Sequence, residues 1–236
     1  MTVVFVHGFL GGSKQWQGQV EALNDLDVVT VDLPGFGDNA HLEPLNSIGA
    51  YADWVLETVR TPRFHLVGHS MGGMIVQEMV ARAPERIDRL VLYGTGPTGD
   101  LPGRFETIEV SKERARTDGP RATARRIAAT WFLQNTHADA YEDCAAIAEQ
   151  SGLAAMIAGL DAMHDWRGVD HLTQIEAETL VVWGDHDRTY PWCQTEHLWQ
   201  SIPKARLAVL PDCAHATHLE RPEVFNTFLK DFIRPS

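Results

Sequence analysis

The sequence predicts an α/β fold: a mostly parallel sheet of about six strands flanked by helices, with an inserted helical segment. Short runs of β-branched and aromatic residues alternate with helical patterns before residue 99 and again after residue 174. Such alternation is typical of a parallel sheet covered on both faces. Between these two parts, amphipathic helical patterns predominate and there is no convincing strand. We therefore expect a core formed by residues 1–98 and 175–236 and a helical insertion formed by residues 99–174.

Each expected element is bounded by turn-forming residues or by a change of periodicity. The pattern before residue 99 predicts strands at 3–6, 28–31, 64–67 and 90–93, and helices at 16–23, 47–60 and 74–83. The inserted segment predicts helices at 121–133, 138–150 and 153–164. The last part predicts strands at 179–183 and 206–209 and helices at 193–202 and 222–233.

Length and charge narrow the class of protein. A chain of 236 residues can bury a large core, and its formal net charge of −12 argues against a nucleic-acid partner and against a polybasic membrane anchor. The longest apolar runs are only as long as strands and Met1 leads directly into one, so we expect no signal peptide and no membrane span. We expect a cytoplasmic monomer or homodimer. Three scattered cysteines without C-x-x-C spacing are typical of reduced thiols: Cys144, Cys193 and Cys213.

The most informative segment is a G-x-S-x-G motif centred on Ser70. It lies between an expected strand and an expected helix, which is the context of a nucleophile elbow, a sharp turn that exposes a serine hydroxyl. The serine backbone is strained in such a turn, and side chains two residues before and after it would collide, so Gly68 and Gly72 leave room. The helix that follows directs its free N–H groups toward any negative charge that forms at the serine.

The strand and helix pattern, together with this motif, resembles the α/β-hydrolase superfamily over nearly the whole chain. The motif at Ser70 and the turn-rich segment 32–37 look most like small carboxylesterases, including the pimeloyl-ester esterase type. The antiparallel hairpin with which larger members begin is missing, which is why we expect a reduced sheet. The resemblance implies that the inserted segment is the cap of the family and lies over the serine.

A serine nucleophile needs a base, and the base needs a carboxylate that orients it. In the family this acid lies on the loop after the strand that follows the cap, where segment 183–191 resembles the G-x-x-D pattern. The resemblance implies Asp187 as the acid. Asp185 is the rival candidate, and its alternative interpretation is a turn-capping carboxylate beside Gly184.

The base is implied on the loop after the final strand. Segment 211–215 matches the Gly-His position of the family, except that Ala214 replaces the glycine, so the resemblance implies His215 as the general base. His218 is the rival, and its alternative interpretation is a polar residue of the following segment. A metal site formed by His215, His218 and Asp185 lacks recognisable ligand spacing, and we expect no metal and no cofactor.

The tetrahedral intermediate of acyl transfer carries a negative oxygen that needs two N–H donors. The residue after the nucleophile supplies the N–H of Met71. Segment 7–9 resembles the family's H-G-x turn, which implies the N–H of Phe9 as the second donor. We expect His7 to order this loop and His69 to pack below the elbow, without a part in the chemistry.

The inserted segment is expected to supply the substrate pocket, and here the sequence is less specific. An apolar helix face and nearby aromatic residues provide the candidates, most of which we expect in the core. The candidate substrate-binding residues are Trp131, Phe132, Met156, Leu160 and Met163. The stretch 112–126 is a basic island that either draws in a carboxylate-bearing substrate or forms a solvated helix face. Its basic residues are Lys112, Arg114, Arg116, Arg121, Arg125 and Arg126.

These residues together imply a serine hydrolase that cleaves a small-molecule carboxylic ester through an acyl-enzyme. Three related chemistries stay open because they also occur on this fold: elimination by a SHCHC-synthase-like lyase, which segment 7–16 resembles, enol-lactone hydrolysis, and carbon–carbon bond hydrolysis of an anionic substrate. A non-catalytic ligand receptor on the same fold is a further alternative. Such a receptor would bind its ligand without turning it over.

Overall fold

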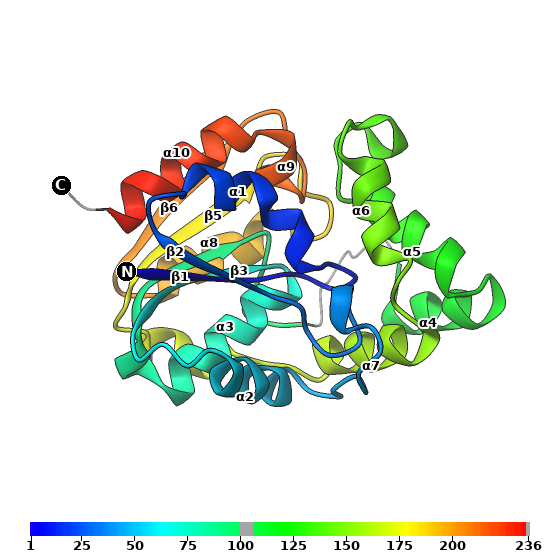
Figure 1. The fold of residues 1–236 in the computed structure, drawn as a ribbon, viewed down its shortest axis with the longest axis horizontal. Helices are drawn as coiled ribbons and strands as arrows, with labels where there is room; N and C mark the ends of the chain where they lie inside the picture. Colours follow the sequence, from blue (N-terminus) through cyan, green and yellow to red (C-terminus); the bar gives the residue numbers. More distant parts are fainter. Residues whose placement is uncertain (100–105, 235–236) are drawn as a thin grey trace.

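A six-stranded sheet forms the centre of the structure, a computed structural model that describes residues 1–99 and 106–234 (Figure 1). Neighbouring strands are all parallel and follow the order β2-β1-β3-β4-β5-β6. The predicted fold class, a parallel sheet of six strands flanked by helices, is confirmed. The strands are β1 (Thr2–Val6), β2 (Asp27–Val31), β3 (Phe64–His69), β4 (Ile87–Tyr93), β5 (Glu178–Gly184) and β6 (Ala205–Leu210).

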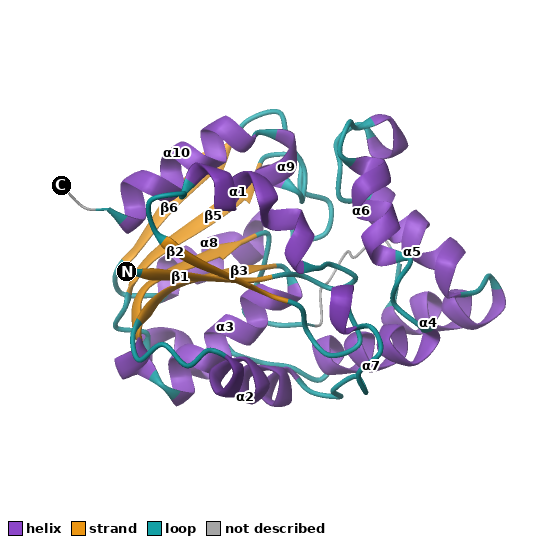
Figure 2. Ribbon diagram, viewed as in Figure 1, coloured by secondary structure: helices purple, strands orange, loops and turns teal. Residues whose placement is uncertain are grey.

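Helices pack on both faces of the sheet because successive side chains of its inner strands alternate between two apolar cores (Figure 2). Val4 and Val6 of β1 belong to one core, and Val3 and Phe5 belong to the other. The first core is completed by α2 (Ile48–Thr58), α3 (Met71–Arg82) and α8 (Trp192–Ser201), and the second by α1 (Gln17–Ala22) and α10 (Pro222–Ile233) with the short α9 (Thr217–Glu220) beside it.

The inserted segment forms a group of helices beyond the carboxyl ends of the strands, at the right of Figure 1. Its two ends lie side by side: Gly99 N–H donates to the Trp166 carbonyl and Gly168 N–H donates to the Pro97 carbonyl, at 3.1 and 2.9 Å. The group therefore leaves and re-enters the core at one place. Its helices are α4 (Ile108–Thr117), α5 (Pro120–Ala129), α6 (Tyr141–Ala148) and α7 (Leu153–His164).

Several helices differ from the sequence prediction, and three of the differences have a clear local reason. Helix α3 begins at Met71 rather than residue 74, directly after the strained turn. Helix α4 was not predicted, because only Ile108, Ser111 and Ala115 of its ten residues are buried and charged residues mask this spacing. Helix α5 ends at Ala129 rather than residue 133, where the Thr130 hydroxyl bonds to a carbonyl of the last turn.

Short 3-10 helices connect several of these elements, at Ser13–Trp16, Gly37–Asn39, Pro84–Arg86, Asn135–His137 and Val169–Gln174. None of the helices in the described ranges has the length and apolar character that crossing a membrane requires.

The two glycines of the elbow motif allow its backbone to pack closely against neighbouring segments. A Cβ atom on Gly72 would lie only 2.3 Å from the carbonyl oxygen of Val6, at the end of β1. A Cβ atom on Gly68 would lie 2.6 Å from the carbonyl oxygen of Gly72 and 2.4 Å from Val76. The start of α3 can therefore touch the end of β1 only if no side chain separates the two backbones.

We expect Gly72→Ala to lower the free energy of unfolding by about 2 kcal/mol or more, because the obstructing atom is backbone and cannot rotate away. Gly18→Ala is the matched control, since nothing lies within 4 Å of a Cβ atom there and alanine favours the helix α1. We expect this control to raise the stability by about 0.5–1 kcal/mol. Urea unfolding of both variants measures the difference, and equal effects would contradict the backbone contact.

A buried histidine belongs to the core between the sheet and the helices α1 and α10. His218 is 1% exposed, shares a hydrogen bond with the Tyr93 hydroxyl through Nδ1, and lies with its ring centroid 4.6 Å from that of Trp16. Burial, followed by the proximity of His215, lowers the pKa of His218 to about 3. His218 is therefore neutral in the folded protein at neutral pH.

This lowered pKa makes the stability of the protein depend on pH. In the unfolded chain His218 binds a proton below about pH 6.5, whereas the folded protein excludes it until about pH 3, so stability is lost as the pH falls through this interval. Between pH 7 and pH 5 the free energy of unfolding should fall in both proteins. We expect the decrease to be about 2 kcal/mol smaller in His218→Gln than in the parent protein. Urea unfolding at both pH values tests this, with exposed His171→Gln as the control. Equal losses in all three proteins would be the contrary result.

Candidate active site

Ser70 lies in a strained turn between β3 and α3. Its φ of 56° and ψ of −121° are unusual for a residue with a side chain, and neighbouring groups hold it there. The Ser70 N–H donates to the Tyr93 carbonyl at 3.1 Å, and the Thr95 hydroxyl donates to the Ser70 carbonyl at 2.8 Å. The strand–turn–helix geometry expected for the G-x-S-x-G motif is present.

Asp187 and His215 are brought together from the loops after β5 and β6. His215 Nδ1 lies 2.9 Å from Asp187 Oδ2, and both side chains are almost completely buried. The second carboxylate oxygen of Asp187 accepts the N–H groups of Thr189 and Tyr190 at 2.7 and 3.1 Å. The Tyr190 ring stacks on His215 at 5.7 Å with an interplanar angle of 15°. These contacts fix both the carboxylate and the imidazole ring.

The rival candidates lie elsewhere. Asp185 is exposed, accepts the N–H of Cys213 at 3.4 Å and approaches His186, as expected of a carboxylate that caps a turn. His218 lies in the core, where its Nδ1 shares a hydrogen bond with the Tyr93 hydroxyl. Within the described ranges, no group of three His, Cys, Asp or Glu residues is arranged to hold a metal ion.

Ser70 and His215 line the same narrow cavity, with a volume of about 30 Å³. Of the five candidate pocket residues, Trp131 and Met163 line it, and none of the described lining residues carries a permanent charge. The remaining walls are Phe9, Gly99, Ile127, Thr130, Thr189 and Tyr190.

The other three pocket candidates, Phe132, Met156 and Leu160, do not line this cavity and are buried in the core. For Met156 and Leu160 the reason is the orientation of α7, which presses against the loops that follow β1 and β2. A Cβ atom on Gly159 would meet the ring of Phe9 at 2.9 Å, so this part of the helix is in contact with those loops. Only the last turn, with Met163, reaches the cavity.

The sequence analysis missed four lining residues for which signals exist. Ile127 and Thr130 precede Trp131 by four and one positions, so one helix end presents all three. Thr189 and Tyr190 directly follow Asp187, and their backbone N–H groups bind its carboxylate.

The backbone N–H groups of Phe9 and Met71, near Ser70, have no acceptor within the described ranges. Met71 is the first residue of α3, where an N–H has no partner within the helix. Phe9 lies on the loop after β1, which approaches the serine so closely that a Cβ atom on Gly8 would be 2.8 Å from Ser70 Cβ. Both residues are thus positioned beside the serine.

The two other histidines of the site hold its loops. His7 Nε2 accepts the N–H of Leu33 at 3.0 Å, so Nδ1 carries the proton and donates to the Gly8 carbonyl at 2.8 Å. His69 stacks on Tyr93 with ring centroids 4.3 Å apart, and its Nε2 lies 3.2 Å from the His215 carbonyl oxygen. Burial lowers the pKa of both histidines, which therefore stay neutral.

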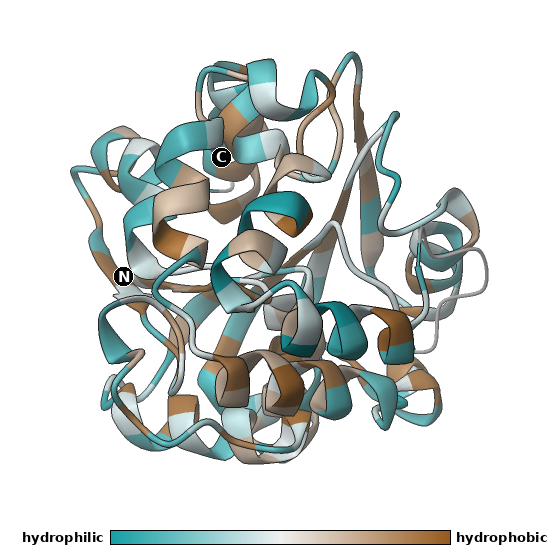
Figure 3. Ribbon diagram, turned by 90° about the vertical axis from the view of Figure 1, so that its right-hand side faces the viewer, coloured by the Kyte–Doolittle hydropathy of each residue, from teal (hydrophilic) through white to brown (hydrophobic). Residues whose placement is uncertain are grey.

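The basic island of residues 112–126 does not line the cavity. Its side chains are paired with carboxylates of the same helical group, as with Arg125, which binds Glu142 at 2.8 Å and Glu149 at 3.0 Å. Figure 3 views the molecule from this end and shows hydrophilic residues interspersed among hydrophobic ones along the helices. The structure favours a solvated, ion-paired face. The other pairs join Lys112 to Asp161, Arg114 and Arg126 to Glu106, Arg116 to Glu113, and Arg121 to Glu149.

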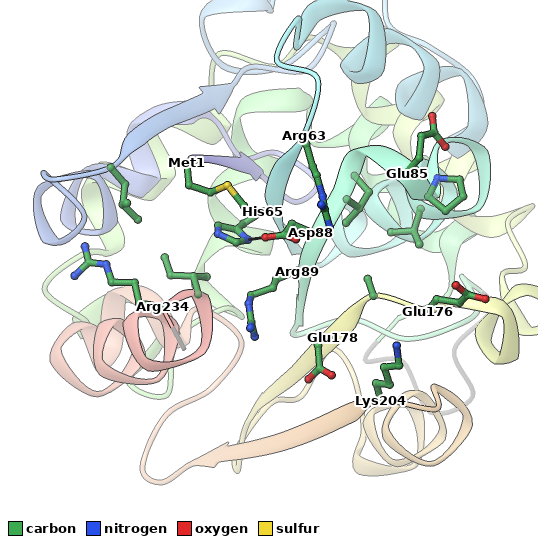
Figure 4. A pocket seen from close by; sticks show the side chains of 16 residues that line it. Met1, Arg63, His65, Glu85, Asp88, Arg89, Glu176, Glu178, Lys204 and Arg234 are labelled. Atoms are coloured by element: carbon green, nitrogen blue, oxygen red, sulfur yellow. Dashed lines mark ion pairs between the residues drawn. The ribbon is translucent and has the colours of Figure 1, made fainter. Parts of the chain in front are cut away.

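A wider hollow of about 860 Å³ lies at the amino ends of the strands (Figure 4). Its lining includes charged side chains of both signs, such as Arg63, which pairs with Asp88 at 2.7 Å. His65 is buried beside Asp88. No serine, threonine or cysteine is among the described residues that line it.

Comparison with known proteins shows the family to which the chain belongs. Residues 3–228 match the model of a family described as the alpha/beta hydrolase family. The protein named carbamate hydrolase RutD of Agrobacterium fabrum is 30% identical over 245 residues, an alignment that covers 100% of this chain and 94% of that protein. The pimeloyl-[acyl-carrier protein] methyl ester esterase of Aromatoleum aromaticum is 29% identical, and the alignment covers 98% of this chain and 98% of that protein.

Solved structures show the same fold. The thermophilic esterase from Thermogutta terrifontis has a TM-score of 0.85 and 27% identity, over 99% of this chain and 89% of that one. The enol-lactonase from Burkholderia xenovorans LB400 has a TM-score of 0.87 and 24% identity, over 98% and 90%. The chain belongs to the alpha/beta hydrolase family and is a hydrolase.

Proposed function

We propose that the protein hydrolyses small, uncharged carboxylic esters through an acyl-enzyme intermediate. One observation carries the proposal: His215, hydrogen-bonded to the buried Asp187, lines the same narrow cavity as a serine held in a strained turn. A hydrogen-bonded carboxylate and imidazole beside a serine is the arrangement that activates a hydroxyl for attack on a carbonyl.

In the proposed reaction, the Ser70 hydroxyl attacks the ester carbonyl while Nε2 of His215 takes its proton. Asp187 keeps Nδ1 of His215 protonated and stabilises the imidazolium. The oxyanion receives hydrogen bonds from the backbone N–H groups of Phe9 and Met71. His215 then protonates the departing alcohol, and a water molecule, activated in the same way, releases the acid from Ser70.

The helices between residues 99 and 174 act in this proposal as a cap that closes the cavity above Ser70. Ile127, Trp131 and Met163 are the cap residues that would contact the acyl group. The cavity that Ser70 and His215 line is narrow. A short acyl group is therefore favoured, and a longer chain requires the cap to shift.

The described walls of the cavity carry no permanent charge, which favours an uncharged substrate over the anionic substrates of the alternative reactions. A lyase or a carbon–carbon bond hydrolase that acts on a carboxylate-bearing substrate needs cationic side chains in the cavity. Among the described lining residues there are none, and the basic island is engaged in ion pairs outside it.

A second candidate is the hydrolysis of a small carbamate. The observation that favours it is the similarity, at 28–30% identity, to several proteins named as carbamate hydrolases. A carbamate presents a carbonyl to the serine in the same way as an ester, and its carbamoyl group is small enough for a narrow cavity.

The first test is the turnover of p-nitrophenyl esters from acetate to decanoate, with p-nitrophenyl N-methylcarbamate beside them. We expect the highest kcat/KM on acetate, and we expect Ser70→Ala to lower kcat at least about 10³-fold without unfolding the protein. Carbamate turnover above that of every ester would favour the second candidate. Ligand binding without turnover by the parent protein would instead indicate a receptor.

Asp187→Asn should lower kcat by about 10³-fold or more, because an amide no longer holds the productive tautomer of His215. Asp185→Asn, a matched change on the same loop, should leave kcat within about 3-fold, because Asp185 is exposed and binds only the turn. Steady-state kinetics on p-nitrophenyl acetate measures both. A nearly silent Asp187→Asn would show that the acid is assigned wrongly.

A further inference from the structure

The loop that carries Trp131 is tied to both loops of the proposed catalytic pair. Three consecutive residues after α5 each make one backbone hydrogen bond to the core. The Trp131 carbonyl accepts the N–H of Ala216 at 2.9 Å, directly beside His215. The next residue, Phe132, is bonded to the side chain of Arg188, and Leu133 is bonded to the side chain of Glu220.

Glu220 connects the cap to the histidine loop with one carboxylate. Its Oε1 accepts the N–H of Leu133 and its Oε2 accepts the N–H of Ala214, both at 2.6 Å. Ala214 immediately precedes His215. Hydrogen bonds from N–H groups to a carboxylate are shorter and stronger than neutral ones, so this link is stiff.

Arg188 makes the corresponding link to the acid loop. Its Nη2 donates to the Phe132 carbonyl at 2.6 Å and lies 3.2 Å from Asn135 Oδ1. Arg188 directly follows Asp187. The residues on either side of Phe132 are therefore held to the His215 loop, and Phe132 itself is held to the Asp187 loop.

We propose that Glu220 and Arg188 are positioning residues that couple the cavity wall at Trp131 to the Asp187–His215 pair. The same hydrogen bonds set the width of the cavity and the position of the base. Displacing the Trp131 loop to admit a long acyl chain pulls on the backbone at Ala214 and Ala216, and so disturbs His215. The selectivity for short acyl groups and the alignment of His215 therefore depend on the same hydrogen bonds, and a change in one changes the other. The inference rests on the proposed function.

Glu220→Gln is the decisive variant, since an amide can accept only one of the two N–H groups and its NH₂ faces the other donor. We expect kcat on p-nitrophenyl acetate to fall about 10-fold, because a displaced base reacts more slowly. We also expect the ratio of kcat/KM on hexanoate to that on acetate to rise at least about 3-fold, because Trp131 is released.

The controls separate positioning from a general loss of structure. Glu223→Gln, exposed at the start of α10, should match the parent protein in both readouts. Arg188→Gln should raise the hexanoate to acetate ratio as an independent variant. Trp131→Ala should raise the ratio by itself, and adding Glu220→Gln to it should lower kcat without raising the ratio further.

An unchanged acyl ratio in Glu220→Gln and in Arg188→Gln, with equal losses on both esters, would overturn the coupling and leave a purely structural role. This failure is distinct from failure of the proposed function. If Ser70→Ala retains the parent turnover, the acyl-enzyme proposal is wrong and the inference fails with it. If Ser70→Ala is inactive while the acyl ratios stay unchanged, only the coupling is wrong.

Discussion

The contact between the start of α3 and the end of β1 determines where Ser70 lies relative to the loop after β1. Their backbones touch because Gly72 has no side chain, and this contact sets Ser70 beside the loop that carries Phe9. The strained conformation of Ser70 is held by bonds to Tyr93 and Thr95, which follow from the pairing of β3 with β4. Packing of the core thus maintains a backbone conformation that an isolated turn would not keep.

The parallel sheet explains why residues far apart in the sequence meet there. The segments after β1, β3, β5 and β6 all leave the sheet at the same edge, and they carry Phe9, Ser70, Asp187 and His215. Ligand sites of parallel α/β sheets lie at this edge for the same reason. Below it, the neutral rings of His69 and Tyr93 support His215 without introducing a charge that would repel an imidazolium.

The helical insertion affects the site through few residues. Most of its apolar side chains join the large core of α2 and α3, and its many charged residues pair with one another. Only the end of α5, the end of α7 and Gly99 contribute described walls to the cavity. The loop after α5 matters most, because it provides Trp131 and is bonded to both loops of the Asp187–His215 pair.

The sequence by itself determined the fold class and the composition of the elbow, because both depend on local patterns. Alternating apolar runs predict parallel strands, and the spacing of Gly68, Ser70 and Gly72 reflects steric requirements of a few residues. The choice between Asp187 and Asp185 required a resemblance to known hydrolases, since both carboxylates stand on one turn. Only the tertiary structure showed which of them is buried against His215.

The tertiary structure also decided which residues of the inserted helices line the cavity. Met156, Leu160 and Met163 share one helix and one apolar character, so periodicity cannot distinguish them. The approach of α7 to Phe9 and Phe36 at Gly159 buries the first two and leaves Met163 at the cavity. The bonds of Glu220 and Arg188 likewise join residues 87 and 56 positions apart, and such long-range contacts depend on how the insertion docks rather than on any local pattern.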